Sequence, residues 1–181
     1  MKAKKTHRPY ELQEYDPKWK ETFLSTAEKI RPLFGDSVIA IEHIGSTSVE
    51  GMVAKPQVDI LVVVKDLDLV PLRYDSIRSA GFTPRGREYV GNGDEYITQD
   101  SADGKRIVSI HVLQEGWSQI ADYRALREYL KTHPEDRELY IRTKRDLYSK
   151  HKDDFHSYDS GKTQMISFLV DRARKWYSSL M

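Results

Sequence analysis

Residues 41–64 read IEHIGSTSVEGMVAKPQVDILVVV, and this stretch decides the fold. Its pattern predicts one strand that ends before Gly45 and a second strand over Val58–Val64. Glycine lacks a Cβ, so the chain can turn sharply at Gly45 and bring backbone N–H groups close to an anion, while the hydroxyl groups of Ser46 and Thr47 add donors. The stretch therefore predicts a strand, an anion-binding turn and a second strand beside the first.

A single carboxylate, Asp59, interrupts the apolar second strand. Burying an ionised carboxylate without a partner costs several kcal/mol, so we expect Asp59 to be paired. Two interpretations stay open. Asp59 is a metal ligand, or it is a structural carboxylate that caps the Gly45 turn.

The rest of the chain predicts strands followed by helices. We expect a helix from Asp16-Pro17 to Gly35, strands over 38–44 and 58–64, a short helix over 67–80, strands over 82–89, 95–99 and 105–113, and three helices after Trp117 with breaks at His133-Pro134 and 155–158. The fold class is therefore α+β, with a mixed sheet of about five strands flanked by helices and a helical C-terminal part. We expect one domain over 1–181, with an α/β core over 36–115 and a helical part over 116–181 packed on it.

Composition excludes several classes of protein. The 181 residues carry 29 basic and 28 acidic side chains, so no overall field favours nucleic acid or a membrane, and a nucleotide or other phosphate-bearing small molecule is the expected partner. The absence of cysteine excludes disulfides, cysteine-based zinc sites and thiol nucleophiles. No apolar run approaches the ~18 residues that span a bilayer, and the basic residues 1–10 read as a frayed tail, so we expect a cytoplasmic protein.

The string EHIGSTSVEGMVAKPQVDI, residues 42–60, resembles the signature of the GrpB family, EHIGSTAVPGLxAKPxIDI. The resemblance continues through His111-Val112, 126–130, His133-Pro134 and 158–162, so it covers nearly the whole chain. It implies the nucleotidyltransferase superfamily, with the fold of polymerase-β-like enzymes.

Nucleotidyl transfer requires a group that holds the triphosphate, divalent cations that bridge its oxygens, and a base or metal that activates the acceptor hydroxyl. The Gly45–Ser46–Thr47 turn can fill the first role, and Asp59 can supply one carboxylate ligand to Mg²⁺. Enzymes of the superfamily usually have a second acidic residue two positions on, where this chain has Leu61. They also have a third on a later strand, where we find His111.

These departures decide the expected metal site. The alternation of residues 108–112 puts His111 on the less apolar face of its strand, where it can share a face with Asp59 across paired strands about 4–5 Å apart. We expect Asp59 and His111 to be catalytic, and Asp59, Glu42 and His111 to bind a divalent cation, Mg²⁺ or Mn²⁺, with Zn²⁺ also compatible. The alternative for His111, and for His43, is a buried imidazole satisfied by a backbone or Asp partner.

Three further cations are candidate phosphate ligands. Lys55 lies in a loop stiffened by Pro56, and Lys162 lies in the first turns of the last helix, where the helix dipole is positive. Arg127 shares one helix face with Arg124 and Lys131 at three- and four-residue spacing, and its planar fork suits a phosphate. Solvated side chains are the alternative for Lys55 and Arg127, and a plain helix start capped by Asp159 or Ser160 is the alternative for Lys162.

Two functional classes stay open. The first is an enzyme that transfers a nucleotidyl group from a nucleoside triphosphate to a small acceptor. The second is a catalytically reduced nucleotide- or phosphate-binding module, linked to coenzyme A metabolism because GrpB-like domains occur fused to dephospho-CoA kinases. Leu61 favours the second class, whereas the Gly-Ser turn, Asp59 and Lys55 favour ligand chemistry over none. No GxGxxG or Walker A motif is present, which excludes the Rossmann and P-loop readings.

Overall fold

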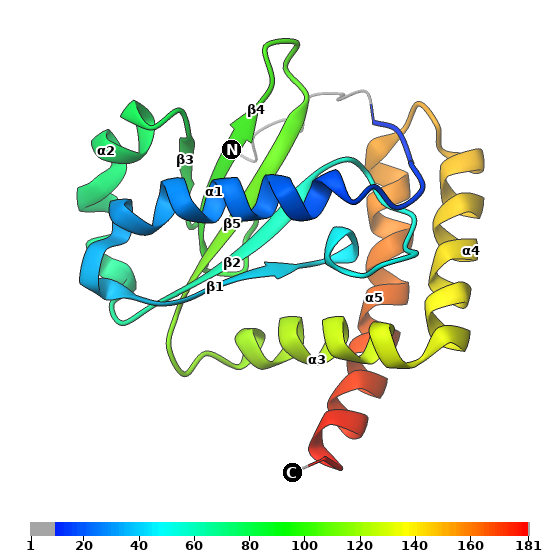
Figure 1. Cartoon of the computed structure of the whole chain (residues 1–181). Helices are drawn as coiled ribbons and strands as arrows, with labels where there is room; N and C mark the ends of the chain where they lie inside the picture. Colours follow the sequence, from blue (N-terminus) through cyan, green and yellow to red (C-terminus); the bar gives the residue numbers. More distant parts are fainter. Residues whose placement is uncertain (1–9, 181) are drawn as a thin grey trace.

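A computed structural model describes residues 10–180 of the chain. The expected N-terminal tail therefore lies, except for Tyr10, outside the described residues. The elements in chain order, where η marks a short 3-10 helix, are α1 (Lys18–Phe34), η1 (Gly35–Ser37), β1 (Val38–Ile44), η2 (Ser46–Ser48), β2 (Val58–Val64), η3 (Leu67–Leu69), η4 (Pro71–Arg73), α2 (Tyr74–Ser79), β3 (Thr83–Gly86), β4 (Glu95–Asp100), β5 (Arg106–Gln114), α3 (Ser118–Thr132), α4 (Pro134–Lys150) and α5 (Phe155–Ser178) (Figure 1).

Five strands form one mixed sheet in the order β1–β2–β5–β4–β3. The central pair, β2 and β5, is parallel, and every other neighbouring pair is antiparallel. Strands of a parallel pair are usually covered on both faces, which explains why β2 reads as the nearly continuous apolar run VDILVVV. The predicted α+β class with a mixed sheet of about five strands is confirmed.

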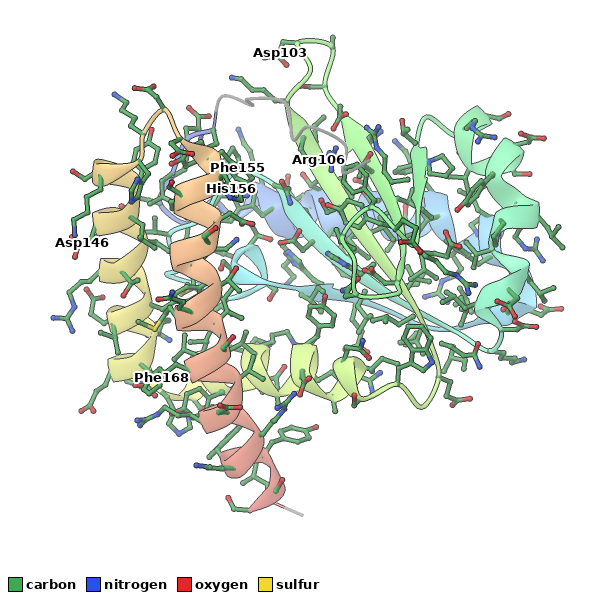
Figure 2. The ribbon with its side chains drawn as sticks, turned by 180° about the vertical axis from the view of Figure 1, so that it is seen from behind. Asp103, Arg106, Asp146, Phe155, His156 and Phe168 are labelled. Carbon is green, nitrogen blue, oxygen red and sulfur yellow. The ribbon has the colours of Figure 1, made fainter. Side chains whose placement is uncertain are left out.

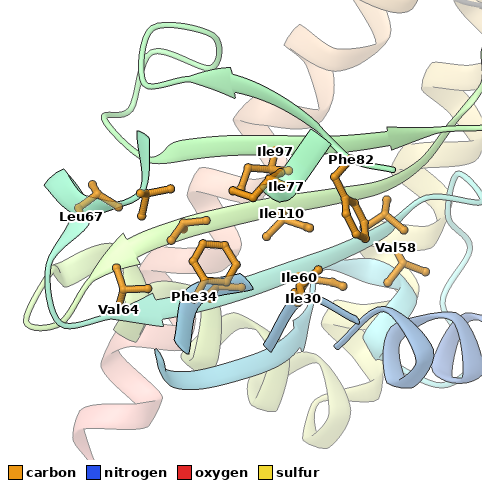
Figure 3. Packing of buried hydrophobic residues seen from close by; sticks show 14 of the residues in the cluster. Ile30, Phe34, Val58, Ile60, Val64, Leu67, Ile77, Phe82, Ile97 and Ile110 are labelled. Carbon is orange, nitrogen blue, oxygen red and sulfur yellow. The ribbon is translucent and has the colours of Figure 1, made fainter. Parts of the chain in front are cut away.

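One face of the sheet packs against α1 and α2. Ile30 and Phe34 of α1 and Ile77 of α2 join the even-numbered residues of β2 and β5 in one buried cluster (Figure 3). Because side chains alternate along a strand, the odd-numbered residues of the same strands face the other way. That second face, with Leu61 and Asp59, is covered by α3 through Ile120.

The C-terminal helices form a second layer of packing at one end of the sheet, where α4 and α5 lie side by side (Figure 1). They enclose the loop that follows η2, so that Met52 and Val53 are buried among Tyr129, Tyr140 and Leu169. The loop after the Gly45 turn is thereby held by helices from the far end of the chain. Among the described residues, no helix combines the length and apolar character that crossing a membrane requires.

Three predicted boundaries are wrong. The strand expected over 82–89 is shorter, because Gly86 has φ +76° and turns the chain. The helix expected over 67–80 is two 3-10 turns followed by α2, since Pro71 has no N–H to donate to a continuous helix. The break expected over 155–158 is the first turn of α5, because the side chain of Asp154 accepts a hydrogen bond from Ser157 N–H and caps the helix.

Candidate functional site

The Gly45 turn lies directly against Asp59. Ile44 is paired with Asp59 across β1 and β2, and Gly45 follows with φ +70° and ψ −171°. A Cβ at Gly45 would stand 2.7 Å from Asp59 Oδ2, so the turn requires glycine both for its backbone angles and for its space. The turn continues into η2, where Ser48 Oγ donates a hydrogen bond of 2.6 Å to the backbone oxygen of Gly45.

Asp59 is held by a polar chain that crosses the sheet. Gln57 Nε2 donates to Asp59 Oδ1 at 3.1 Å and to Ser109 Oγ at 3.0 Å. Ser109 stands opposite Asp59 on β5, and its hydroxyl is 2.7 Å from the Tyr96 hydroxyl. The hydrogen bond that Asp59 accepts therefore comes from a neutral side chain, and its oxygen Oδ2 faces the Gly45 turn.

Lys144 of α4 is a site residue that the sequence analysis missed. Its Nζ donates to Ser46 Oγ at 2.5 Å and to the backbone oxygen of Val53 at 2.7 Å, and it lies 4.3 Å from the centre of the Tyr140 ring. The residue is 2 % exposed. The sequence feature that could have identified Lys144 is its helical spacing. It lies four residues after Tyr140 and three residues before Leu147, on the face of α4 that packs against the rest of the protein.

The charges of two other lysines, Lys55 and Lys162, act on the Lys144 amine. Burial lowers the pKa of Lys144 well below its usual value, and the positive charges of Lys162 and Lys55 lower it further. Burial, and then Lys162, lower the pKa of Lys55 to about 8. We call Lys55, Lys144 and Lys162 the lysine cluster; its members come from the loop after η2, from α4 and from α5.

The members of the cluster have different surroundings. Lys55 Nζ lies 4.4 Å from the centre of the Phe155 ring, at the N-terminal end of α5 (Figure 2). Lys162 forms an ion pair of 3.1 Å with Asp159. Arg106, at the start of β5 (Figure 2), also lowers the pKa of Lys55, and its buried Nη2 has no hydrogen-bond partner among residues 10–180. Arg106 and Lys162 are each paired with a carboxylate, Asp100 and Asp159, whereas Lys55 and Lys144 have no ion pair among residues 10–180.

His111 is paired with a carboxylate that the sequence analysis did not single out. Its Nδ1 lies 2.6 Å from Oδ2 of Asp94, which is fully buried and whose Oδ1 has no partner among residues 10–180. The imidazole lies between the Tyr96 and Tyr123 rings, at centroid distances of 5.0 and 5.6 Å. Burial, and then the negative charges of Asp94 and Asp59, raise the pKa of Tyr123.

The expected pairing of His111 with Asp59 at about 4–5 Å across neighbouring strands is wrong. In the register of β2 and β5, Asp59 stands opposite Ser109, and His111 stands opposite Leu61. The two side chains share a face of the sheet but are offset by two residues. Parallel pairing places the strands in a register that the alternation pattern does not specify.

Glu42 and Arg127 contact each other. Glu42 Oε1 accepts hydrogen bonds from Arg124 at 2.6 and 2.9 Å, and Glu42 Oε2 accepts one from Arg127 Nη1 at 3.0 Å. Arg127 also donates to the backbone oxygen of His43 at 3.1 Å. Although burial raises the pKa of Glu42, the hydrogen bonds and charges of the two arginines lower it overall. The three side chains tie α3 to β1.

His43 lies on the other face of the sheet. It stacks on Phe23 of α1 with ring centroids 5.0 Å apart, and its Nε2 is 2.9 Å from Thr47 Oγ1. Burial lowers its pKa to about 4, against the opposing effect of the Asp59 charge. His43 is therefore a neutral imidazole. Its contact with Thr47 supports the Gly45 turn from the face of the sheet that packs on α1.

The side chains do not fit the donor set that a pair of divalent cations requires. Glu42, Leu61 and His111 form one row across β1, β2 and β5, so an apolar side chain stands between the two polar ones. Glu42 is engaged by arginines and His111 by Asp94. Over residues 10–180, no three His, Cys, Asp or Glu side chains gather where they could hold a metal ion. Of the three expected metal ligands, Asp59 is the one that has no charged partner in this part of the chain, and one carboxylate does not hold a pair of cations.

Comparison with known proteins places these features in a family. The model of the family described as "GrpB protein" matches residues 9–172. The "UPF0157 protein YqkA" of Bacillus subtilis is 32% identical over 169 residues, which are 93% of this chain and 48% of that protein. The "UPF0157 protein SCO7215" of Streptomyces coelicolor is 35% identical over 162 residues, 90% of this chain and 83% of that one. A "Dephospho-CoA kinase" of Mycobacterium tuberculosis is 25% identical, covering 93% of this chain and 47% of the kinase.

Two solved structures extend the comparison. The conserved protein GrpB from Enterococcus faecalis superimposes with a TM-score of 0.80 at 28% identity, covering 90% of this chain and 98% of that one. The Cid1 poly(U) polymerase superimposes with a TM-score of 0.52 at 13% identity, covering 76% of this chain and 43% of that one, which shows a likeness in fold alone. The chain spans about half the length of YqkA and of the kinase. The match over residues 9–172 shows that this chain belongs to the GrpB family, with a fold similar to that of nucleotidyltransferases.

Proposed function

We propose that this protein binds the phosphate chain of a nucleotide at the Ser46 turn. The observation that carries the proposal is Lys144, a buried amine whose hydrogen bonds go to Ser46 Oγ and to the backbone oxygen of Val53, both neutral acceptors. An ammonium group buried without a counter-ion is costly, and strongly perturbed groups of this kind cluster at functional sites. An anion at Ser46 would supply the counter-charge.

The relatives support a nucleotide as the carrier of that anion. The fold is similar to that of a poly(U) polymerase, and another matching protein is named as a dephospho-CoA kinase. Nucleoside triphosphates and dephospho-CoA each contain a nucleoside joined to a chain of phosphates. We therefore propose these two groups of compounds as the ligand class.

Thermal unfolding with ligand tests this proposal. A ligand that binds only the native state at 100 times its Kd adds about 2.7 kcal/mol of stability, which raises the Tm of a domain of this size by about 5–11 °C. We expect ATP, tripolyphosphate or dephospho-CoA to raise the Tm of the wild type and of the Lys150→Met control, whose exposed side chain lies at the end of α4. The Lys144→Met variant should lose that rise. If no phosphate-bearing compound shifts the wild type, the proposal is wrong.

Nucleotidyl transfer is a second candidate function, and the Asp94–His111 pair favours it. The pair lies on the face of the sheet that carries Asp59, and an imidazole oriented by a buried carboxylate is suited to accept a proton. In this reaction the acceptor hydroxyl oxygen would bond to the α-phosphorus, the bond between that phosphorus and the oxygen bridging to the β-phosphate would break, and pyrophosphate would leave. The hydroxyl proton would pass to His111 Nε2.

A single-turnover assay tests the second candidate. Radiolabelled nucleoside triphosphate is incubated with a panel of small alcohols and phosphates, and labelled product and pyrophosphate are measured. We expect His111→Gln to keep nucleotide binding and to lose transfer by at least 100-fold, in the range typical of general-base loss. Binding without transfer to any acceptor would leave the protein as a binding module.

A further inference from the structure

We infer that the phosphate chain is neutralised by the lysine cluster, Lys55, Lys144 and Lys162, and that it binds without divalent cations. The inference rests on the proposed function, because it concerns the same ligand at the same turn. It also departs from what the fold of the protein implies, since enzymes of this fold use cations held by paired carboxylates.

The carboxylates of the site cannot supply the usual support for two cations. The position that pairs with Asp59 on β2 holds Leu61, which is fully buried. Glu42, the neighbour of Leu61 on β1, already accepts three hydrogen bonds from arginine. One oxygen of Asp59 accepts from Gln57, and the other faces Gly45. Each Mg²⁺ that bridges phosphates usually takes one or two carboxylates from the protein, so a single carboxylate does not hold a pair of cations. Of the expected ligands within residues 10–180, Asp59 is the one carboxylate without an arginine partner.

The lysines can supply the positive charge that those cations would otherwise provide. They come from three separate segments, the loop after η2, α4 and α5, so the position of each is set by packing and not by a shared helix face. Lys144 contacts the turn directly, at Ser46 Oγ. Among residues 10–180, Lys55 and Lys144 have aromatic rings near their amines and no ion pair. Three ammonium groups can compensate several negative charges of a phosphate chain.

The protonation of the cluster should change when the phosphate binds. Without ligand, burial is the main cause of the lowered pKa values of Lys55 and Lys144, and the positive charge of Lys162 adds to it for both. Arg106 further lowers the pKa of Lys55, and Lys55 further lowers that of Lys144. The Asp59 carboxylate opposes the shift for both lysines. The Asp159 carboxylate also opposes the shift of Lys55 and forms an ion pair with Lys162. Of the buried phenols, Tyr140 contacts Lys144 through its ring, and the charge of Lys162 acts on Tyr158.

A bound polyanion favours the charged form of each amine and so raises its pKa. The protein should therefore take up protons on binding near pH 8, and its affinity should fall as the pH rises above about 8, the pKa of Lys55. Binding that depended on an ionised Asp59 and a metal would take up no proton on a lysine.

Calorimetric titration of tripolyphosphate and of ATP tests the inference. Each titration is performed with EDTA and with Mg²⁺, at pH 8, in two buffers that differ in ionisation enthalpy. We expect binding in EDTA, with a Kd within about threefold of that in Mg²⁺ and with measurable proton uptake. Lys55→Met and Lys162→Met should each weaken binding by at least tenfold, and Lys150→Met should have no effect.

Asp59→Asn separates the two explanations. If the lysine cluster neutralises the phosphates, removal of the nearby negative charge keeps or tightens binding in EDTA. If Asp59 holds a cation, the same variant abolishes binding, and the wild type binds only in Mg²⁺; that result would overturn the inference and leave the proposed function standing. Failure of both compounds to bind under either condition would overturn the proposed function itself. Far-UV circular dichroism confirms that each variant is folded.

Discussion

Replacing Gly45 by alanine should destabilise the protein far more than replacing Gly51. Both glycines have positive φ, +70° and +80°, so both substitutions force alanine into a conformation that favours glycine. They differ in space. An added Cβ meets nothing within 4 Å at Gly51, but it would lie 2.7 Å from Asp59 Oδ2 and 3.3 Å from Asp59 Cβ at Gly45.

The magnitude follows from two contributions. The backbone region of Gly45, with ψ −171°, costs a non-glycine residue about 1–3 kcal/mol. Inserting a methyl group into a filled space adds about 1–3 kcal/mol. We therefore expect Gly45→Ala to lower the free energy of unfolding by about 2–6 kcal/mol, and Gly51→Ala by about 1–2 kcal/mol.

Urea unfolding of four proteins measures these contributions: the wild type, Gly45→Ala, Asp59→Ala and the double variant. Removing the Asp59 carboxylate frees the space, so the double variant should recover about 1–3 kcal/mol relative to the sum of the single changes. If Gly45→Ala costs no more than Gly51→Ala, or if the effects of Gly45→Ala and Asp59→Ala are additive, the reasoning is refuted, because contact with Asp59 then does not limit the size of residue 45.

Three other predictions concern charge. Burial lowers the pKa of His43 to about 4, so the unfolded state binds more protons than the folded state between pH 4 and 6.5. The free energy of unfolding of the wild type should therefore rise across this window by up to about 3 kcal/mol. Urea unfolding of His43→Gln should show a smaller rise with pH. The lowered pKa of Lys55 has the same sign at higher pH, so the stability of the wild type relative to Lys55→Met should rise between pH 8 and 10.5; a constant difference would contradict it. Glu42→Gln should cost about 1–3 kcal/mol by weakening the hydrogen bonds from Arg124 and Arg127, and chemical denaturation in low and high salt would refute this if the variant were as stable as the wild type.

Much of the fold could be predicted from local sequence. Strand alternation, the apolar run 58–64 and the glycine at position 45 depend on neighbours in the chain, since backbone angles and side-chain period are properties of a few consecutive residues. The helix boundaries near Pro71 and Asp154 could not be predicted from local sequence. A proline can stand in the first turn of a helix or interrupt it, and an aspartate caps a helix only where the residues after it fold as one.

The same distinction between local sequence and tertiary packing applies to the candidate site. The strand–turn–strand that carries Ser46 and Asp59 follows from residues within one stretch of sequence. The register of β2 against β5, which places His111 opposite Leu61 and not opposite Asp59, depends on strands about fifty residues apart. A shift of two residues would keep every side chain on the same face of the sheet, so the alternation pattern cannot distinguish the registers. Lys144 reaches Ser46 across 98 residues only because α4 packs on the loop after the turn. Sequence alone therefore determined which backbone forms the turn, whereas tertiary packing decided which charges surround it.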